Sequence, residues 1–288
     1  MIALAAATHP DDIEFMMAGT LLRLKDAGCE IHLWNLANGC CGSATLSREE
    51  AAAVRWEEAQ ASSKVAGGTA HPPLFDDLGI YYDAPSLARV AAVIRQVQPD
   101  IILTQSPQDY MEDHQNTARL VVTGAFTRAM KNFVTNPDIA TYDKPVALYH
   151  ALPHGLNDAL RQPVEPHFFT DIGPVLVRKR AMLACHASQK EWLDVTQGMD
   201  AYLDEMERMS QEVARMSRKH ESGYALDSPW CGFCPTELAC DESAATSCFG
   251  RGSEVHTGKY EFAEGWRRHS HLGFGPEDFD PISDLLKT

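Results

Sequence analysis

The chain has 288 residues, of which 44% are hydrophobic and 23% are charged. These fractions are close to those of an average soluble globular protein, and they exclude disordered, collagen-like and coiled-coil classes. The formal net charge is −15. Because so negative a surface repels phosphate backbones and anionic lipids, we expect neither a nucleic-acid-binding protein nor a membrane-surface protein.

The lack of targeting signals and the pattern of cysteines lead us to expect a cytoplasmic protein. No apolar run approaches the roughly 20 residues that span a bilayer, and residues 1–8 lack the basic start and long apolar stretch of a signal peptide. Four of the eight cysteines are scattered and four cluster late, which is unlike a secreted disulfide framework. We also expect a homo-oligomer.

Strands and helices alternate along the first 131 residues. We expect buried strands at 2–8, 30–36 and 100–104, with helices at 13–27, 86–97 and 117–131 and a polar loop at 105–115. Ser47 and Glu50 form a capping box that predicts a further helix running to residue 66. This alternation predicts an α/β fold: a Rossmann-like, doubly wound and mostly parallel sheet with helices on both faces.

The organisation changes after about residue 134. A strand is expected at 146–149, helices at 175–185 and 192–219, and an amphipathic segment at 282–286. We expect residues 1–190 to form the α/β domain. Residues 191–288 are expected to be a helical and irregular extension with a cysteine cluster, packed on the same domain and covering one mouth of the sheet.

Ligand-type side chains follow two of the expected strands. His9-Pro10-Asp11-Asp12 follows the first, and residues 109–114 follow the strand at 100–104. Ligands in open α/β sheets bind beyond the carboxyl ends of the strands. His9, Asp12 and His114 make the two-imidazole, one-carboxylate set of a catalytic zinc site, while Asp11 is free to act on the metal-bound water.

Simpler interpretations exist for each motif alone. An aspartate at a helix start often only caps the helix, and a lone histidine after a strand is usually a hydrogen-bonded surface group. Ferrous iron in facial-triad oxygenases also takes two histidines and a carboxylate. Those oxygenases use a closer His-x-Asp spacing, whereas His9 and Asp12 are three residues apart, which favours hydrolytic zinc.

The same residues resemble a known family, the PIG-L/LmbE-like zinc-dependent de-N-acetylases. The resemblance starts at Ala7-Thr8-His9-Pro10-Asp11-Asp12 and covers roughly residues 2–190. Further matching segments follow in order: Asn38-Gly39-Cys40-Cys41-Gly42, Arg55-Trp56-Glu57-Glu58-Ala59, Asp77, Asp113-His114 and His186-Ala187-Ser188-Gln189.

The resemblance implies a hydrolase that removes acetyl groups from N-acetylglucosamine-bearing compounds. His9, Asp12 and His114 would be the metal ligands and Asp11 the general base, acting on water whose pKa the zinc lowers. Two alternatives stay open: an amidase acting on a sugar–thiol conjugate, and a non-catalytic carbohydrate or metal binder.

Three further residues are expected to contact the substrate. By resemblance, Arg55 and Asp77 would hold sugar hydroxyls, although an ordinary ion pair or loop cap explains them equally well. Tyr110, in the same segment as the expected metal ligand His114, is the third.

One position departs from the family pattern. The family usually has a histidine three residues before the second metal-binding histidine, where it helps to stabilise the oxyanion, and this chain has Met111 there. A methionine cannot donate a hydrogen bond, and loss of one oxyanion donor typically costs about a hundred-fold or more in rate. We expect His186 to act as the catalytic substitute, with Tyr110 or the metal alone as alternatives; a packed helix histidine is the simpler explanation of His186.

The late cysteines form a separate cluster. Four thiols fall within a short stretch that begins with a Cys-x-x-Cys pair: Cys231, Cys234, Cys240 and Cys248. Such a pair is typical of structural zinc sites, so a second, structural metal is one prediction. Disulfides or free thiols are the other, and the loop-like sequence before Cys231 argues against thioredoxin-type redox catalysis.

Overall fold

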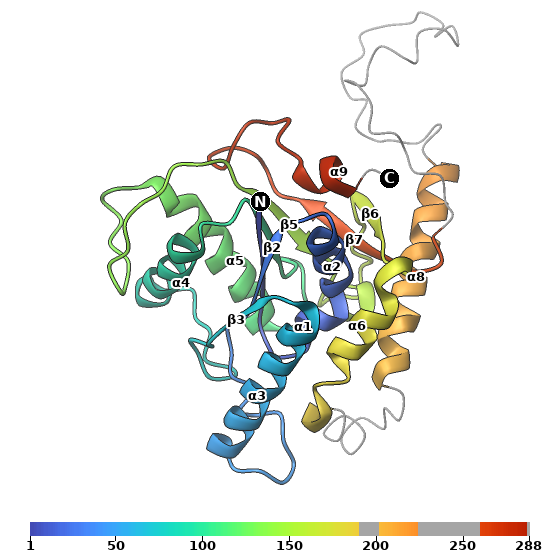
Figure 1. Ribbon diagram of the computed structural model, residues 1–288, viewed down its shortest axis with the longest axis horizontal. Helices are drawn as coiled ribbons and strands as arrows, with labels where there is room; N and C mark the ends of the chain where they lie inside the picture. The colour runs from blue at the N-terminus through green and yellow to red at the C-terminus, as the bar shows by residue number, and fades with distance from the viewer. Residues whose placement is uncertain (190–201, 224–259, 287–288) are drawn as a thin grey trace, which may run out of the picture.

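The computed structural model describes residues 1–189, 202–223 and 260–286, which form a seven-stranded sheet between two layers of helices (Figure 1). The strands are β1 (Ile2–Ala7), β2 (Glu30–Asn35), β3 (Thr69–His71), β4 (Ile101–Thr104), β5 (Ala147–Ala151), β6 (Phe168–Asp171) and β7 (Ala263–Arg268). Their order across the sheet is β3-β2-β1-β4-β5-β7-β6. Neighbouring strands are parallel except β7, which is antiparallel to both β5 and β6. The prediction of a doubly wound, mostly parallel α/β sheet is therefore confirmed.

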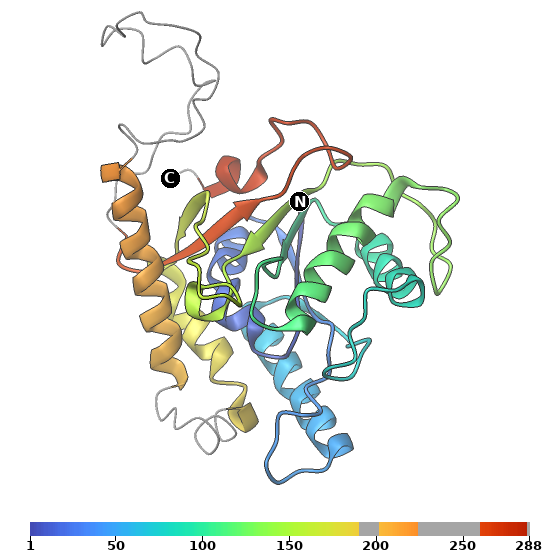
Figure 2. The same cartoon turned by 180° about the vertical axis from the view of Figure 1, so that it is seen from behind.

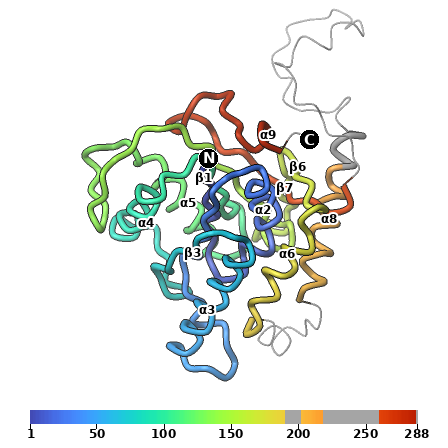
Figure 3. Tube along the Cα trace, in the orientation of Figure 1, coloured from blue at the N-terminus to red at the C-terminus, as the bar shows by residue number. Residues whose placement is uncertain are grey.

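Helices cover both faces of this sheet. Those described are α1 (Asp12–Met16), α2 (Ala18–Asp26), α3 (Arg48–Ala66), α4 (Ala84–Val97), α5 (Glu112–Phe126), α6 (Leu176–Leu183), α8 (Tyr202–Gly223) and α9 (Pro281–Leu286). Helices α4 and α5 lie on one face, and α2, α6 and α8 on the other (Figures 1 and 2). Helix α9, near the end of the described chain, packs beside α2 (Figure 3). None of the described helices is long and apolar enough to cross a membrane.

The central strand β1 shows why its sequence is continuously apolar. Ala3 and Ala5 face the core beneath α2 and α6, whereas Leu4 and Ala6 face the core beneath α4 and α5. All four side chains are fully buried. A strand covered on both faces has no solvent side, so it shows no alternation of polar and apolar residues.

The start of α3 is set by local hydrogen bonds, as its sequence predicts. The Ser47 hydroxyl accepts from the Glu50 amide at 3.3 Å, and the Glu50 carboxylate accepts from the Ser47 amide at 2.9 Å. Gly67 ends the helix with a φ of 70°, a left-handed conformation that glycine adopts without steric cost. The predicted capping box is confirmed.

Two helices differ markedly from their predicted bounds. The helix expected at 13–27 is broken at Met17, whose φ of −132° separates the short α1 from α2. Helix α5 begins at Glu112, so His114 lies in its first turn and not in the loop expected at 105–115. The expected end at residue 131 is also wrong, because α5 ends at Phe126. Acidic Glu112 and Asp113 suit the positive end of a helix dipole, which explains the early start.

Strands β6 and β7 were not predicted from the sequence. The buried Glu264 of β7 accepts the amides of Gly19 and Thr20 at 2.8 and 2.7 Å and pairs with Lys179 at 2.7 Å. A charged residue at the second position of β7 hides the apolar pattern of that strand. The late cysteines, Cys231 to Cys248, lie outside the described residues.

Candidate metal centre

The predicted metal ligands come together where β1 and β4 end. These strands are neighbours in the sheet, and β1 has β2 on its other side, so the strand order reverses at this point. Open α/β sheets bind their ligands at such a point. His9 follows β1, Asp12 begins α1, and His114 lies in the first turn of α5. All three side chains are largely buried: their exposed fractions are 16%, 12% and 3%.

The three ligand atoms are spaced as the corners of a coordination polyhedron. His9 Nδ1 lies 3.3 Å from His114 Nε2 and 3.6 Å from Asp12 Oδ2, and His114 Nε2 lies 3.4 Å from Asp12 Oδ2. Ligand atoms at roughly 2.0–2.2 Å from a tetrahedral zinc ion stand about 3.3–3.6 Å apart. The donor set and its spacing therefore fit one divalent ion.

A carboxylate backs each imidazole. Asp109 Oδ1 lies 3.1 Å from His114 Nδ1, and Asp113 Oδ2 lies 3.4 Å from His9 Nε2. Such carboxylate–histidine pairs orient the ring and fix which nitrogen faces the ion. Asp12 is held in a similar way, because its Oδ2 accepts from the His9 amide at 2.7 Å and from Gln105 Nε2 at 2.9 Å.

The centre strongly favours a positive charge. Burial opposes protonation of His9, but hydrogen bonds to Asp113 and Asp12 outweigh it and raise the pKa of His9 to about 10. Burial also opposes protonation of His114, and the carboxylates of Asp12 and Asp109 raise its pKa nonetheless. The two imidazoles in turn hold the pKa of Asp12 below its usual range despite its burial. A metal cation bound between His9, Asp12 and His114 would supply this positive charge in place of the protons on the two imidazoles.

Asp11 sits beside this centre without being part of the ligand set. Its backbone has a φ of 103°, a left-handed conformation that costs strain in a residue other than glycine and is found mostly at functional sites. The hydroxyl of Tyr202, at the start of α8, donates to Asp11 Oδ2 at 2.7 Å. Burial raises the pKa of Asp11, while Arg55 opposes that increase. A buried carboxylate with a raised pKa suits proton transfer.

The predicted substrate residue Arg55 is buried, with an exposed fraction of 3%. Its guanidinium donates to the Pro10 carbonyl and to the side chain of Gln189, and one of its nitrogens lies 3.8 Å from Asp11 Oδ1. Arg55 therefore stabilises the turn that carries Asp11.

The other two predicted substrate residues differ in exposure. Asp77 is 8% exposed, and its two oxygens accept the amides of Gly39 and Cys41 at 2.7 and 2.8 Å. Tyr110 is 52% exposed, and its ring meets that of His114 edge-on at 5.7 Å between centroids. Of these three residues, Tyr110 is the one open to solvent beside the metal ligands.

His186 lies deeper than expected for a group that must reach a substrate. It is 1% exposed, and its Nε2 lies 3.4 Å from Glu14 Oε1 on α1. Among the described residues no hydrogen bond joins His186 to His9, Asp12 or His114. Met111 is the residue before α5, and its amide donates to Asp109 at 3.1 Å.

Sequence reasoning missed three side chains that support the centre. Asp109 was noted only as one of several ligand-type residues, Gln105 was placed in the polar loop, and Tyr202 was given no role. Asp109 lies just before the helix that carries His114, and this spacing could have indicated that Asp109 orients the His114 ring. Tyr202 lies 191 positions from Asp11, and no sequence signal links them.

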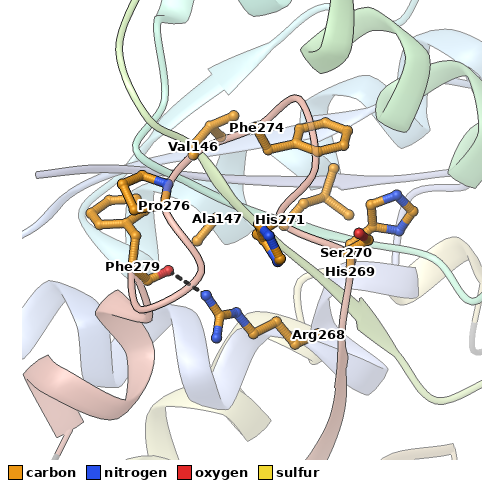
Figure 4. A pocket seen from close by; sticks show the side chains of 11 residues that line it. Val146, Ala147, Arg268, His269, Ser270, His271, Phe274, Pro276 and Phe279 are labelled. Atoms are coloured by element: carbon orange, nitrogen blue, oxygen red, sulfur yellow. Dashed lines mark hydrogen bonds between the residues drawn. The ribbon is translucent and has the colours of Figure 1, made fainter.

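A small pocket elsewhere is separate from this centre (Figure 4). It lies near the amino end of β5, between Val146 and the segment that follows β7, whereas the metal ligands lie beyond the carboxyl ends of β1 and β4. Arg268 lines it and donates to the carbonyl of Phe279 at 2.8 Å.

Part of the chain matches the model of a family of de-N-acetylases. Residues 4–125 match the model of the PIG-L family, described as GlcNAc-PI de-N-acetylase. This match confirms, for residues 4–125, the resemblance seen in the sequence.

Individual relatives fall into two kinds. The diacetylchitobiose deacetylase of Thermococcus kodakarensis is 27% identical over 188 residues, 63% of this chain and 67% of that protein. The 4-oxalmesaconate hydratase of Pseudomonas putida is 27% identical over 209 residues, 65% of this chain and 74% of that protein.

Solved structures of both kinds share the fold. The N,N'-diacetylchitobiose deacetylase of Pyrococcus horikoshii superposes with a TM-score of 0.68 and 19% identity, covering 98% of this chain and 88% of that one. The 4-carboxy-2-hydroxymuconate hydratase of Pseudomonas putida superposes with a TM-score of 0.65 and 19% identity, covering 93% and 95%.

Proposed function

We propose that this protein is a zinc-dependent amide hydrolase that removes an acetyl group from an N-acetylated amino sugar or its conjugate. The observation that carries the proposal is the convergence of His9 Nδ1, Asp12 Oδ2 and His114 Nε2, with the buried carboxylate of Asp11 beside them. The match to the PIG-L family and the diacetylchitobiose deacetylase relative support the substrate class.

His9, Asp12 and His114 would hold the ion. A zinc ion in such a site supplies a Lewis acid and lowers the pKa of water toward ~7. Asp11 takes the proton of the attacking water and returns it to the leaving amine. Tyr202 and Arg55 hold Asp11 and its turn in place, so the carboxylate does not have to reorganise during the proton transfer.

The oxyanion requires a donor that Met111 does not provide. Tyr110 is our proposed donor, because its ring contacts His114 and is open to solvent. The prediction that His186 takes this role stays a prediction. The contact between His186 and the buried Glu14 supports instead a structural role for His186.

Addition of water to a carbon–carbon double bond is the second candidate function. It is favoured by the hydratase relative, at 27% identity over 209 residues. The substrate names of these hydratases denote carboxylates, whereas this chain carries a net charge of −15. A strongly negative protein repels anionic substrates, so the neutral acetylated sugar ranks first.

The experiment combines metal analysis with product detection. The purified protein should contain one zinc ion at this centre and release acetate from N,N'-diacetylchitobiose or N-acetylglucosamine. The double variant His9→Ala, His114→Ala should lose both the ion and the activity. The matched control His32→Ala, His71→Ala removes another imidazole pair, 2.8 Å apart on β2 and β3, and should keep both.

Other outcomes select among the remaining alternatives. Hydration of an unsaturated tricarboxylate without acetate release would favour the hydratase. Release of a different acyl group from a sugar–thiol conjugate would favour the amidase. Bound metal without any turnover would favour a binding protein, and unchanged metal content in the His9/His114 variant would refute the ligand assignment.

A further inference from the structure

A second group of metal-binding side chains lies in the loop after β2. The ligand atoms of Cys40, Cys41 and Asp77 all lie within 4.8 Å of one another. The two sulfur atoms are 4.0 Å apart. Thiolates bound at about 2.3 Å to one tetrahedral zinc ion stand roughly 3.8 Å apart. The pair is therefore spaced for a shared ion with little movement.

The carboxylate of this group is fixed in advance. Asp77 accepts the Gly39 amide at 2.7 Å through one oxygen and the Cys41 amide at 2.8 Å through the other. Each carboxylate oxygen can accept two hydrogen bonds or ligand bonds, so each retains one free position. The same two amides hold the loop that carries both thiols against Asp77.

The group is also accessible from solvent. Cys41 is exposed, whereas Cys40 and Asp77 are 6% and 8% exposed. An ion would enter past Cys41 and become enclosed by the other two side chains. Both thiols are free within the described part of the chain.

We propose that Cys40, Cys41 and Asp77 form a second cation site, for a thiophilic divalent metal such as zinc or cadmium. Two thiolates and one carboxylate make a softer donor set than the two imidazoles and one carboxylate of the first centre. The site uses none of the residues that would hold the catalytic ion, although it shares Asp77 with the expected substrate contacts.

The position of this site connects it to the turn that carries Asp11. Gly39 has a φ of 75°, and a Cβ there would come within 2.6 Å of Arg55 Cδ, so the loop packs directly on the Arg55 side chain. Arg55 in turn donates to the Pro10 carbonyl. An ion that fixes residues 39–41 would also fix the surface on which Arg55 rests.

One cationic side chain opposes binding. Arg48 NH1 lies 3.5 Å from Cys41 Sγ, and Arg48 also pairs with the exposed Asp76 at 2.8 Å. Its positive charge disfavours a metal ion at the same sulfur. Removing that charge should therefore tighten metal binding, which no purely structural role of these cysteines would produce.

The test is a cadmium titration of the full chain in the presence of a phosphine reductant. The cadmium–thiolate charge-transfer absorbance reports only sulfur sites, so cadmium bound at the His9 centre does not contribute. Cys41→Ser should lose one thiolate-bound cadmium ion per chain relative to the unchanged protein. Cys40→Ala should do the same, whereas the control Cys185→Ser, which changes another free cysteine, should lose none.

Two further measurements make the test decisive. Arg48→Gln should bind cadmium roughly two- to five-fold more tightly, the range expected for one exposed charge contact. His9→Ala should retain the full charge-transfer absorbance. The proposal is overturned if Cys41→Ser keeps the absorbance and cadmium count of the unchanged protein, or if Arg48→Gln binds more weakly. The unchanged late cysteines contribute equally in every variant, so they cancel in the comparison.

Discussion

The hydroxyl of Tyr202 offers a direct test of how Asp11, the proposed general base, is held in place. It donates to Asp11 Oδ2 at 2.7 Å, and the side chain is 1% exposed. Burial and the neighbouring Asp11 raise the pKa of Tyr202 well above its usual value, so the phenol stays protonated and remains a donor. Tyr202→Phe removes this donor and leaves the ring contact with Phe15, at 5.2 Å between centroids, in place.

The size of the effect follows from the charge of the acceptor. Hydrogen bonds to charged groups contribute about 1.5–3 kcal/mol, and each ~1.4 kcal/mol lost from transition-state stabilisation lowers the rate ten-fold. We expect kcat for amide hydrolysis to fall roughly ten- to a hundred-fold. KM should change little, because so buried a side chain does not reach the substrate. Zinc content should be retained.

Tyr149→Phe is the matched control for this variant. Tyr149 is also fully buried, and its hydroxyl donates to Asp280 Oδ1 at 2.6 Å, in the C-terminal segment. This control should lose stability but keep kcat. Steady-state kinetics with metal analysis compares the two. A Tyr202→Phe enzyme with unchanged kcat, or an equal loss of kcat in Tyr149→Phe, would refute the positioning role.

Three other outcomes are expected. Asp11→Asn should keep its zinc and lose hydrolysis by roughly 10²–10⁴-fold, as for loss of a general base; near-normal turnover in the metal-loaded variant would contradict the role. Lys179→Met should lower the free energy of unfolding by about 3–5 kcal/mol in urea, because it leaves Glu264 charged and unpaired in the core; a loss below ~1 kcal/mol would mean that Glu264 is not a buried charge. Burial, with the charge of His32, lowers the pKa of His71 from 6.5 to about 4. Between these pH values the unfolded chain is protonated at His71 and the folded protein is not, so the free energy of unfolding falls as the pH drops from 6.5 to 4. His71→Asn should flatten that part of the stability curve, and an unchanged slope would argue against the shift.

The parts of the fold and site that sequence predicts are those set by neighbours along the chain. Strand β1 can be predicted from the sequence because both of its faces are apolar. His9 and Asp12 can be predicted as ligands because they follow the end of β1 directly. Strand β7 is not readable, because its buried Glu264 is neutralised by Lys179, 85 positions away. The same holds for Tyr202, whose contact with Asp11 depends on tertiary packing alone. Local patterns predict the elements and the candidate ligands. Asp109 lies close in sequence to His114, which it orients, whereas Gln105 and Tyr202 reach Asp12 and Asp11 only through tertiary packing.

The place of β7 between β5 and β6 has a consequence for synthesis on the ribosome. Strand β6 is hydrogen-bonded in the sheet through β7 alone, as far as the described residues show. Strand β7 follows β6 by roughly ninety residues, which takes about 5–20 s to translate at ordinary rates. During that interval β5 and β6 emerge with an unpaired edge, and unpaired edges are where chains join one another wrongly. We therefore expect nascent chains of this protein to be more prone to aggregation until β7 has been made.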